Sequence, residues 1–365
     1  MIFGGRSVEH EVSLLSAKSI IRNLDPEKYE VFPIFIEKGG MWRKASISSW
    51  LGEGGLEFFG DSVLSPSLSP GNPVFYEISD RGLLSEHKVD VIFPVLHGTY
   101  GEDGTVQGMF ELMGVPYVGA SVLGSSVGMD KIVMKALLKA SGLPVVEYVG
   151  FYKHDWETGK DAVRSRIIKE IGLPCFVKSA DLGSSVGITK VKTEDELPGA
   201  VEYSCRFSKR VIVERAVRKP REIEVSVLGN DDPQASCPGE IVPHREFYDY
   251  TAKYLEEGTG LIAPAELDEE TQEKLRDYAV RTFKALDCSG LGRVDFLLED
   301  GTDEIFVSEI NTIPGFTQIS MYPRLWEVSG LSYARLVNRL IELAVERRRQ
   351  TDSLESDYSE ISGKP

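Results

Sequence analysis

Cysteine is scarce in this 365-residue sequence, and its placement argues against a metal or disulfide scaffold. The cysteines form no CxxC pair and have no histidine neighbour; they are Cys175, Cys205, Cys237 and Cys288. A zinc site and a disulfide framework are therefore not expected, and the thiols are predicted to be buried or half-buried.

Long apolar runs and an excess of positive charge are also missing. No run is long enough to span a membrane, and residues 1–5 do not have the organisation of a signal peptide. Lysine and arginine number 41 against 57 acidic residues, a net charge of −16. Because nucleic acids and anionic membranes bind basic surfaces, neither is expected as a partner. A cytoplasmic protein fits these properties, and an anionic small substrate remains compatible with locally placed lysines and arginines.

Two common nucleotide-binding motifs are absent. The turn Gly4-Gly5 lacks the GxGxxG spacing, and no acidic ribose partner follows it, which argues against a dinucleotide-dependent oxidoreductase. The loop 183–187 is rich in glycine and serine, but no Gly-Lys-Ser/Thr triplet makes it a Walker A motif. This loop follows a strand that ends in Lys178, and its N–H groups and hydroxyls suit a phosphate. A plain turn is the alternative interpretation.

The segment 292–315 contains the most informative pattern in the chain. Two apolar-rich stretches flank a turn around Thr302, which predicts a β-hairpin. A fold about Thr302 pairs Asp295 with Glu309 and Arg293 with Asn311 on one face, because strand side chains alternate. The even-numbered residues are predicted to face the core: Val294, Phe296, Leu298, Phe306 and Ile310. Two carboxylates and an amide oxygen suit Mg²⁺, and a solvated polar strand face is the alternative.

Other polar residues stand where elements begin or end. Lys131 opens a helix over 130–141, Glu214 ends a strand over 211–214, and Glu222 opens the next strand. His97 follows a strand over 89–96, where open α/β sheets bind ligands. Glu9 and Glu11 open the first helix, where one of them could hold a substrate ammonium group. Ordinary strand ends, surface ion pairs and a structural histidine are the alternatives.

The remaining pattern predicts alternating strands and helices, typical of an α/β protein. Residues 45–75 are rich in serine, glycine and proline and are predicted to be irregular. Helices are expected over 12–21, 106–113, 161–171, 269–286 and 333–348, and further strands over 31–37, 115–118, 145–151, 175–178 and 222–228.

Six ordered motifs give the chain a close resemblance to the D-alanine–D-alanine ligases of the ATP-grasp superfamily. They cover residues 4–13, 97–104, 129–131, 183–187, 247–254 and 309–317. The resemblance implies an α/β, three-domain ATP-grasp fold that begins with an open parallel-sheet domain. The implied units are an N-terminal substrate domain over 1–120, a central subdomain over 121–213, a C-terminal subdomain over 214–349 and a disordered tail over 350–365.

The resemblance also implies a role for each matching residue. The nucleotide contacts would be Lys131, Lys178, Ser185, Glu214 and Glu222, and the ligands of two Mg²⁺ ions, with Mn²⁺ as a substitute, would be Asp295, Glu309 and Asn311. Glu11 would hold the ammonium group of the first D-alanine beside His97 and would close the site in a triad with Ser184 and Tyr254. Arg293 and the Gly315 N–H would stabilise the oxyanion, and Lys253 with Ser320 would bind the second carboxylate.

The implied reaction joins two D-alanines at the expense of ATP, for peptidoglycan precursor synthesis. The first carboxylate attacks the γ-phosphate to give an acyl phosphate, and the second amine then displaces phosphate. The implied partners are D-alanine, ATP and a second copy of the chain in a homodimer. A D-alanine–D-lactate or D-alanine–D-serine ligase of the same fold is the first alternative, although residues 247–254 keep the dipeptide-type pattern. A catalytically silent nucleotide-binding protein is the second.

The sequence departs from the family at its ends and at one charge. The first strand usually begins several residues earlier, and the polar residues after Arg349 have no assigned counterpart. Arg215 stands where some relatives have lysine, which a backbone contact would tolerate.

Overall fold

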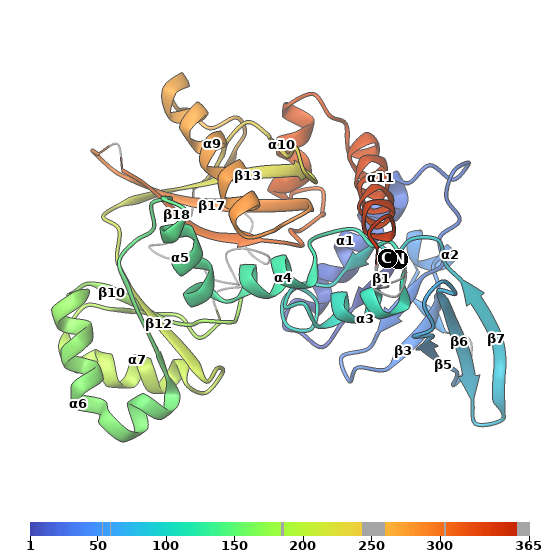
Figure 1. Ribbon diagram of the computed structural model, residues 1–365, viewed down its shortest axis with the longest axis horizontal. Coiled ribbons are helices and arrows are strands. Elements are labelled where there is room, and N and C mark those ends of the chain that lie inside the picture. Colours follow the sequence, from blue (N-terminus) through green and yellow to red (C-terminus); the bar gives the residue numbers. More distant parts are fainter. Residues whose placement is uncertain (53, 59, 184–185, 243–259, 303, 356–365) are drawn as a thin grey trace, which may run out of the picture.

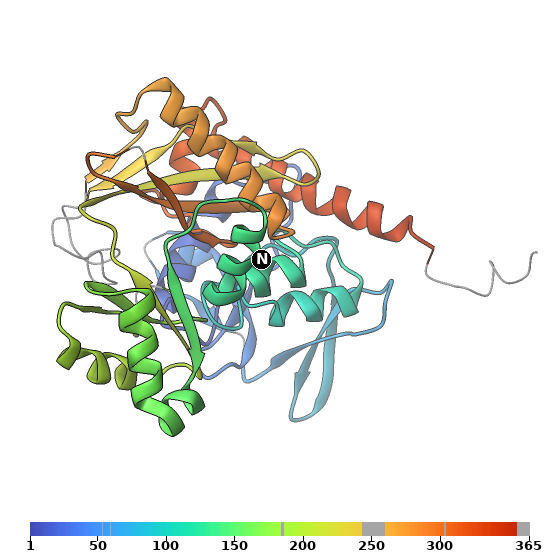
Figure 2. The same ribbon diagram turned by 60° about the vertical axis from the view of Figure 1, so that its left-hand side comes forward.

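The computed structural model contains three parts, each built around its own β-sheet (Figures 1 and 2). It describes residues 1–52, 54–58, 60–183, 186–242, 260–302 and 304–355. Among the helices of these ranges, none combines the length and apolar character needed to cross a membrane.

A five-stranded sheet forms the N-terminal part, in the order β4-β3-β2-β1-β8. Its centre is parallel and consists of β1 (Ile2–Gly4), β2 (Ile34–Ile36) and β8 (Pro94–Val95). β3 (Trp42–Ser46) and β4 (Glu57–Phe58) extend it in antiparallel fashion. The chain turns from β1 towards α1 (His10–Asn23) through Gly4, whose φ is +92°. A Cβ there would lie 2.3 Å from the Ile36 carbonyl oxygen, so this turn requires glycine.

Residues 45–75, predicted to be irregular, contain regular structure, so that prediction is wrong. A short helix, α2 (Ser48–Leu51), is followed by β5 (Val63–Pro66), the first strand of a three-stranded antiparallel sheet. β6 (Val74–Ser79) and β7 (Gly82–Lys88) complete this sheet. The strand predicted over 89–96 is reduced to β8, and the one over 115–118 to an isolated bridge between Ile92 and Tyr117. α3 (Thr105–Met113) follows the prediction.

A buried carboxylate, that of Glu77, connects the strands of this small sheet. Glu77 on β6 accepts hydrogen bonds from the hydroxyls of Ser62, at 2.8 Å, and Ser85, at 2.9 Å. The ring nitrogen Nε2 of His87 lies 2.9 Å from the same carboxylate. Burial raises the pKa of Glu77, but the hydrogen bonds from His87, Ser62 and Ser85 and the charge of Lys44 outweigh it and lower the pKa to about 2.

Glu77→Gln is therefore expected to destabilise the protein in a pH-dependent way. Because the folded-state pKa lies below the ordinary 4.5, the stabilisation by the carboxylate is present above that value and is lost as pH falls towards 2. The difference in unfolding free energy between wild type and variant should thus be largest near neutrality and vanish in acid. Urea unfolding at several pH values measures it, with the exposed Glu86→Gln as the control. An equal difference at all pH values would contradict the role.

The central part is an antiparallel four-stranded sheet in the order β11-β10-β12-β9. Its strands are β9 (Tyr148–Tyr152), β10 (Cys175–Ser179), β11 (Thr189–Val191) and β12 (Arg210–Arg215). The helices α6 (Lys153–Glu170) and α7 (Leu197–Ser204), the latter preceded by the 3-10 turn η1 (Glu194–Glu196), cover one face. Its hydrophobic core is its own, and it includes Phe151, Ile167 and Val213. The central part lies at the lower left of Figure 1.

The C-terminal part contains a sheet in the order β16-β15-β13-β17-β18, with β14 paired to β13. Its strands are β13 (Pro220–Gly229), β14 (Gln234–Ala235), β15 (Gly239–Val242), β16 (Gly260–Ile262), β17 (Gly290–Glu299) and β18 (Ile305–Asn311). α9 (Glu269–Ala285), α4 (Val122–Met129) and α5 (Lys131–Ala140) contribute apolar side chains to its core. α10 (Met321–Val328) and α11 (Tyr333–Asp352) end the described fold. Residues 350–352, assigned from the sequence to a disordered tail, are thus helical.

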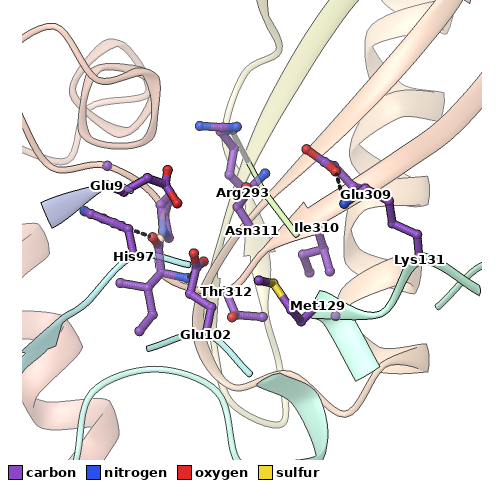
Figure 3. Close-up of a pocket in the computed structure, with 15 residues that line it drawn as sticks. Glu9, His97, Glu102, Met129, Lys131, Arg293, Glu309, Ile310, Asn311 and Thr312 are labelled. Atoms are coloured by element: carbon purple, nitrogen blue, oxygen red, sulfur yellow. Dashed lines mark hydrogen bonds and ion pairs between the residues drawn. The ribbon is translucent and has the colours of Figure 1, made fainter. Parts of the chain in front are cut away.

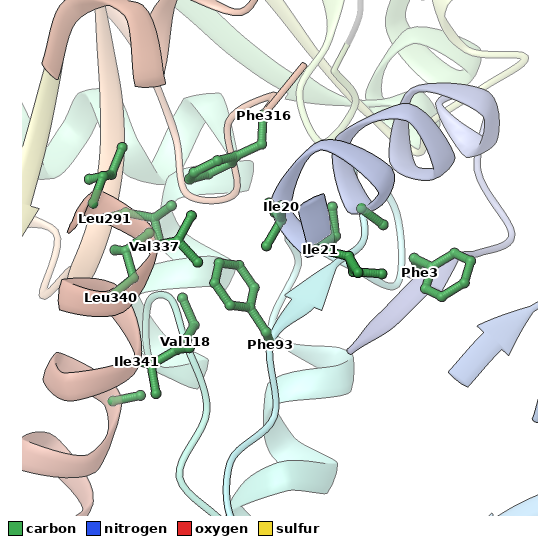
Figure 4. Packing of buried hydrophobic residues seen from close by; sticks show 14 of the residues in the cluster. Phe3, Ile20, Ile21, Phe93, Val118, Leu291, Phe316, Val337, Leu340 and Ile341 are labelled. Atoms are coloured by element: carbon green, nitrogen blue, oxygen red, sulfur yellow. The ribbon is translucent and has the colours of Figure 1, made fainter. Parts of the chain in front are cut away.

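One hydrophobic core joins the N-terminal and C-terminal parts (Figure 4). Ile20 of α1 and Phe93 pack beside Phe316 and the α11 residues Val337 and Leu340. All five side chains are at least nine-tenths buried. Because this core is shared, the loop around Phe316 is held firmly against the N-terminal sheet.

Candidate active site

The hairpin of β17 and β18 contains a β-bulge that sets the position of the site carboxylates. Near the turn, Phe296 pairs with Val307 and Leu298 with Ile305. Between Phe296 and Asp295, on the side away from the turn, the register shifts by one residue. Asp295 therefore pairs with Glu309, and Arg293 pairs with Asn311. Ser308 is the extra residue. The predicted pairs are confirmed, although the fold is not symmetric about Thr302.

The bulge also changes which side chains reach the core. Before it, Ile305 and Val307 are buried in the core of the C-terminal part, and beyond it Ile310 is buried there. Phe306 was predicted to face this core, and that prediction is wrong. Its ring lies on the opposite face, 5.3 Å from the guanidinium carbon of Arg215.

The polar face of the hairpin is a network of compensated charges. Arg293 donates to both carboxylate oxygens of Asp295, each at 2.7 Å, and Asn311 Nδ2 donates to one of them at 3.0 Å. The Arg293 Nε atom also lies 3.1 Å from Glu224 on β13. The Nζ atom of Lys131, the first residue of α5, lies 3.2 Å from Glu309 and donates to the carbonyl of Leu182. These contacts fix the directions of the carboxylate side chains at this end of the hairpin.

Arg293, Glu309 and Asn311 reach cavity A, which both the N-terminal and C-terminal parts line (Figure 3). Glu9, His97 and Glu102 line one side, Lys131 and Glu309 the other, and Arg293 and Asn311 lie between them in Figure 3. The loop 312–315 completes the lining.

The N-terminal part holds this loop through its backbone. His97 Nδ1 donates to the Ile313 carbonyl at 2.8 Å, and the Ile313 N–H donates to Glu102 at 2.9 Å. The Phe316 N–H donates to Ser16 Oγ at 3.1 Å. At Gly315, an added Cβ would lie 2.8 Å from the Ser320 hydroxyl, so the close approach favours glycine. Ser320 itself accepts from the Thr317 N–H at 2.9 Å at the start of α10 and does not line cavity A.

A second and larger space, cavity B, adjoins cavity A between the central and C-terminal sheets. It holds about 1250 Å³ of open space, against about 560 Å³ for cavity A, and the two share Lys131, Gly183 and Glu309. Phe176, Ile188, Val217 and Leu297 give cavity B apolar walls, and Lys178, Lys190, Glu214 and Glu222 are among its charged lining residues. Apolar walls with a few placed polar groups are typical of a ligand site.

Glu11 does not lie at this site, which corrects its proposed placement. Its side chain is 63% exposed and pairs with Lys38 at 2.8 Å. Glu9, two residues earlier, is 7% exposed and lines cavity A. A Cβ on Gly98 would lie 2.9 Å from its Oε2 atom, and one on Gly183 would lie 3.8 Å away. Glu9 is thus the carboxylate at the junction of the N-terminal part and the glycine loop.

The described site accounts for most of the residues singled out from the sequence. Cavities A and B bring together His97, Lys131, Lys178, Glu214, Glu222, Arg293, Asp295, Glu309, Asn311 and Gly315. Ser184, Ser185, Lys253 and Tyr254 lie outside the described residues. The site also includes Glu9, Glu102 and Glu224. Of these, Glu224 stands two residues after Glu222 on β13, a spacing that could have indicated a shared face.

Two sheets enclosing a charged cleft, with carboxylates and lysines converging at its inner end, define an ATP-grasp enzyme. Residues 1–120 match the sequence model described as "D-ala D-ala ligase N-terminus", and residues 137–342 match "D-ala D-ala ligase C-terminus". The chain belongs to the D-alanine–D-alanine ligase family. The predicted α/β ATP-grasp fold is thereby confirmed.

Close relatives cover almost the whole chain. The D-alanine–D-alanine ligase of Natranaerobius thermophilus is 46% identical over 360 residues, which span 99% of this chain and 98% of the relative. That of Thermoanaerobacter pseudethanolicus is 47% identical over 358 residues, with 96% and 97% covered.

Solved structures show the same similarity. The D-alanine–D-alanine ligase of Coxiella burnetii superposes with a TM-score of 0.84 at 37% identity, covering 100% of this chain and 98% of that one. The VanG D-Ala:D-Ser ligase of Enterococcus faecalis superposes with a TM-score of 0.83 at 36% identity, covering 94% and 98%.

Proposed function

We propose that this ligase joins two D-alanine molecules to D-alanyl-D-alanine at the expense of ATP, through an acyl phosphate, for peptidoglycan precursor synthesis. The observation that carries the proposal is the junction of cavities A and B at Lys131 and Glu309. A nucleotide in cavity B would extend its phosphates to this junction, where the carboxylate of a D-alanine in cavity A would meet them.

Lys131 and Arg293 lower the barrier between the two anions. The attacking carboxylate and the γ-phosphate repel each other, and both cations lie on the lining of cavity A. Positioning and fixed charge are the main contributions a protein makes to phosphoryl transfer. In the second step, Arg293 and the Gly315 N–H would stabilise the oxyanion formed when the second amine attacks the acyl phosphate.

Glu9 rather than Glu11 is the residue proposed to receive the ammonium group of the first D-alanine. Its buried position on cavity A supports this role, because a desolvated carboxylate binds a cation more strongly than an exposed one. His97 orients the loop 312–315 and faces the same cavity. Ser184, Lys253 and Tyr254 keep their proposed roles in closing the site and binding the second substrate.

Asp295, Glu309 and Asn311 are proposed to hold Mg²⁺, with Mn²⁺ as a substitute. Their donors, two carboxylates and an amide, are the hard oxygens that Mg²⁺ prefers, and phosphate oxygens and water usually complete its shell. Within the described ranges, histidines, cysteines and carboxylates form no cluster of three that could hold a metal, so this site depends on the amide and the substrate. Bound there, two ions would neutralise phosphate charge.

A D-alanine–D-serine ligase is the second candidate, because the VanG enzyme is a structural relative of this chain. We expect phosphate release from ATP that requires both D-alanine and Mg²⁺. With D-alanine, D-serine and D-lactate present together near neutral pH, D-alanyl-D-alanine should be the main product and the depsipeptide negligible. Chromatography of the products measures this ratio. A majority of D-alanyl-D-serine or D-alanyl-D-lactate would assign the other specificity.

A homodimer in the cytoplasm is proposed as the working form. The family resemblance supports the homodimer, and the need for cytoplasmic ATP supports the location. Sedimentation of the purified chain tests the dimer.

A further inference from the structure

A fully buried lysine lies behind the wall of cavity B and has no role in the reaction described above. Lys135 follows Lys131 by one helical turn on α5, and its side chain is 0% exposed. Its Nζ atom lies 3.2 Å from Glu214 Oε1. Lysine is rarely buried without a partner, because its charge loses the stabilisation that water gives. Burial lowers the pKa of Lys135, and the nearby Glu214 partly offsets that effect.

Glu214 connects this lysine to the cavity. Its other oxygen, Oε2, accepts a hydrogen bond from Lys178 at 2.7 Å, and both Glu214 and Lys178 line cavity B. Burial acts to raise the pKa of Glu214, but the two lysines outweigh it and hold the pKa well below the usual value. In the described part of the chain, Glu214 Oε1 receives no hydrogen bond despite its complete burial. This buried oxygen faces the Lys135 ammonium, so Lys135 holds the carboxylate from behind while Glu214 lines cavity B.

Stability alone does not account for this arrangement. A buried ion pair contributes little net stabilisation, because the loss of hydration offsets the attraction, and apolar residues of similar volume often serve as well. Two lysines around one carboxylate instead fix both its charge and its direction at the wall of the ligand site.

We propose that Lys135 is a positioning residue that holds the Glu214 carboxylate towards the 6-amino group of the purine and so makes the site select adenine nucleotides. The inference rests on the proposed binding of ATP in cavity B. A 6-amino group donates hydrogen bonds that a carboxylate accepts, and the adjacent Lys178 can donate to a purine ring nitrogen. A 6-keto purine presents an acceptor in place of the amino group, and an ionised carboxylate repels it.

The experiment compares the affinities of ATP and ITP, which differ at this purine position, in the presence of Mg²⁺. Isothermal titration calorimetry on the intact chain measures both dissociation constants without relying on turnover. Wild type should bind ATP more tightly than ITP. Lys135→Met should reduce the ATP-over-ITP preference about tenfold, the effect of losing one well-oriented charge-assisted hydrogen bond. Lys139→Met, at an exposed position one turn further along α5, should leave the preference unchanged.

A second set of variants keeps the test valid if the single variant does not fold. Lys135→Met combined with Glu214→Gln removes both charges of the buried pair, and its preference should equal that of Glu214→Gln alone. An equal loss of ATP and ITP affinity in Lys135→Met would indicate a merely structural role and overturn the proposal. So would a further loss of preference when Lys135→Met is added to Glu214→Gln, or equal binding of both nucleotides by wild type. Failure of wild type to bind either nucleotide would instead refute the proposed function of cavity B.

Discussion

Glu309→Gln is expected to lower kcat/KM for D-alanine by about 10³-fold while leaving the fold intact. Glu309 lies where cavities A and B meet, 3.2 Å from Lys131. A neutral amide would weaken metal binding and leave Lys131 without its counter-charge. Charge stabilisation by such a metal is worth several kcal/mol, and each 1.36 kcal/mol corresponds to about tenfold in rate. Phosphate release under saturating ATP, repeated over a Mg²⁺ titration, measures the loss.

The matched control for this prediction is Glu304→Gln. Glu304 lies on the same hairpin, is exposed and lines neither cavity. It should retain wild-type activity. Comparable turnover in both variants, with unchanged thermal stability, would remove Glu309 from the metal site.

The second large effect is expected from Glu9→Gln, with Glu11→Gln as its internal comparison. If Glu9 receives the substrate ammonium group, losing its charge should reduce kcat/KM for D-alanine by about 10- to 100-fold, the value of one buried hydrogen bond to a charged group. Glu11→Gln should change it by less than about threefold, because an exposed ion pair such as Glu11–Lys38 contributes at most about 1 kcal/mol.

Initial rates over a range of D-alanine concentrations distinguish the two carboxylates. The KM for ATP should stay near the wild-type value in both variants, since neither residue lines cavity B. A large loss in Glu11→Gln with none in Glu9→Gln would reverse the assignment and show that the helix start rearranges when substrate binds.

The comparison of Glu9 with Glu11 shows what a sequence motif leaves open. Both glutamates open the same helix, and either could meet an ammonium group by residue type alone. Which one faces the cavity depends on the turn at Gly4 and on the packing of α1 against the N-terminal sheet. Those are long-range contacts that a local pattern does not contain.

The hairpin shows both the strength and the limit of periodicity. Alternation correctly paired Asp295 with Glu309 and Arg293 with Asn311. It failed at Phe306, because a bulge reverses the alternation and no residue type in the segment marks its place. The prediction that residues 45–75 are irregular failed for a related reason. Its serines and prolines suggest loops, whereas β5 gains its structure from pairing with β6, which lies farther along the chain.

The buried Lys135 could not be recognised from the sequence. Its position in the predicted helix 130–141 is equally compatible with an exposed lysine. Only the proximity of β12 to α5, brought about by the fold, places Glu214 beside it.

The bulge at Ser308 makes the register of β18, rather than the side chain of Ser308, the sensitive variable in this hairpin. Exchanging Ser308 for another residue keeps the count of residues, and Glu309 stays opposite Asp295. Closing the bulge while keeping Ser308 would instead place Ser308 opposite Asp295 and carry Glu309 and Asn311 to the opposite face without altering either one. A loss of the bulge without the loss of one residue is therefore expected to abolish activity, whereas substitution of Ser308 keeps Glu309 opposite Asp295.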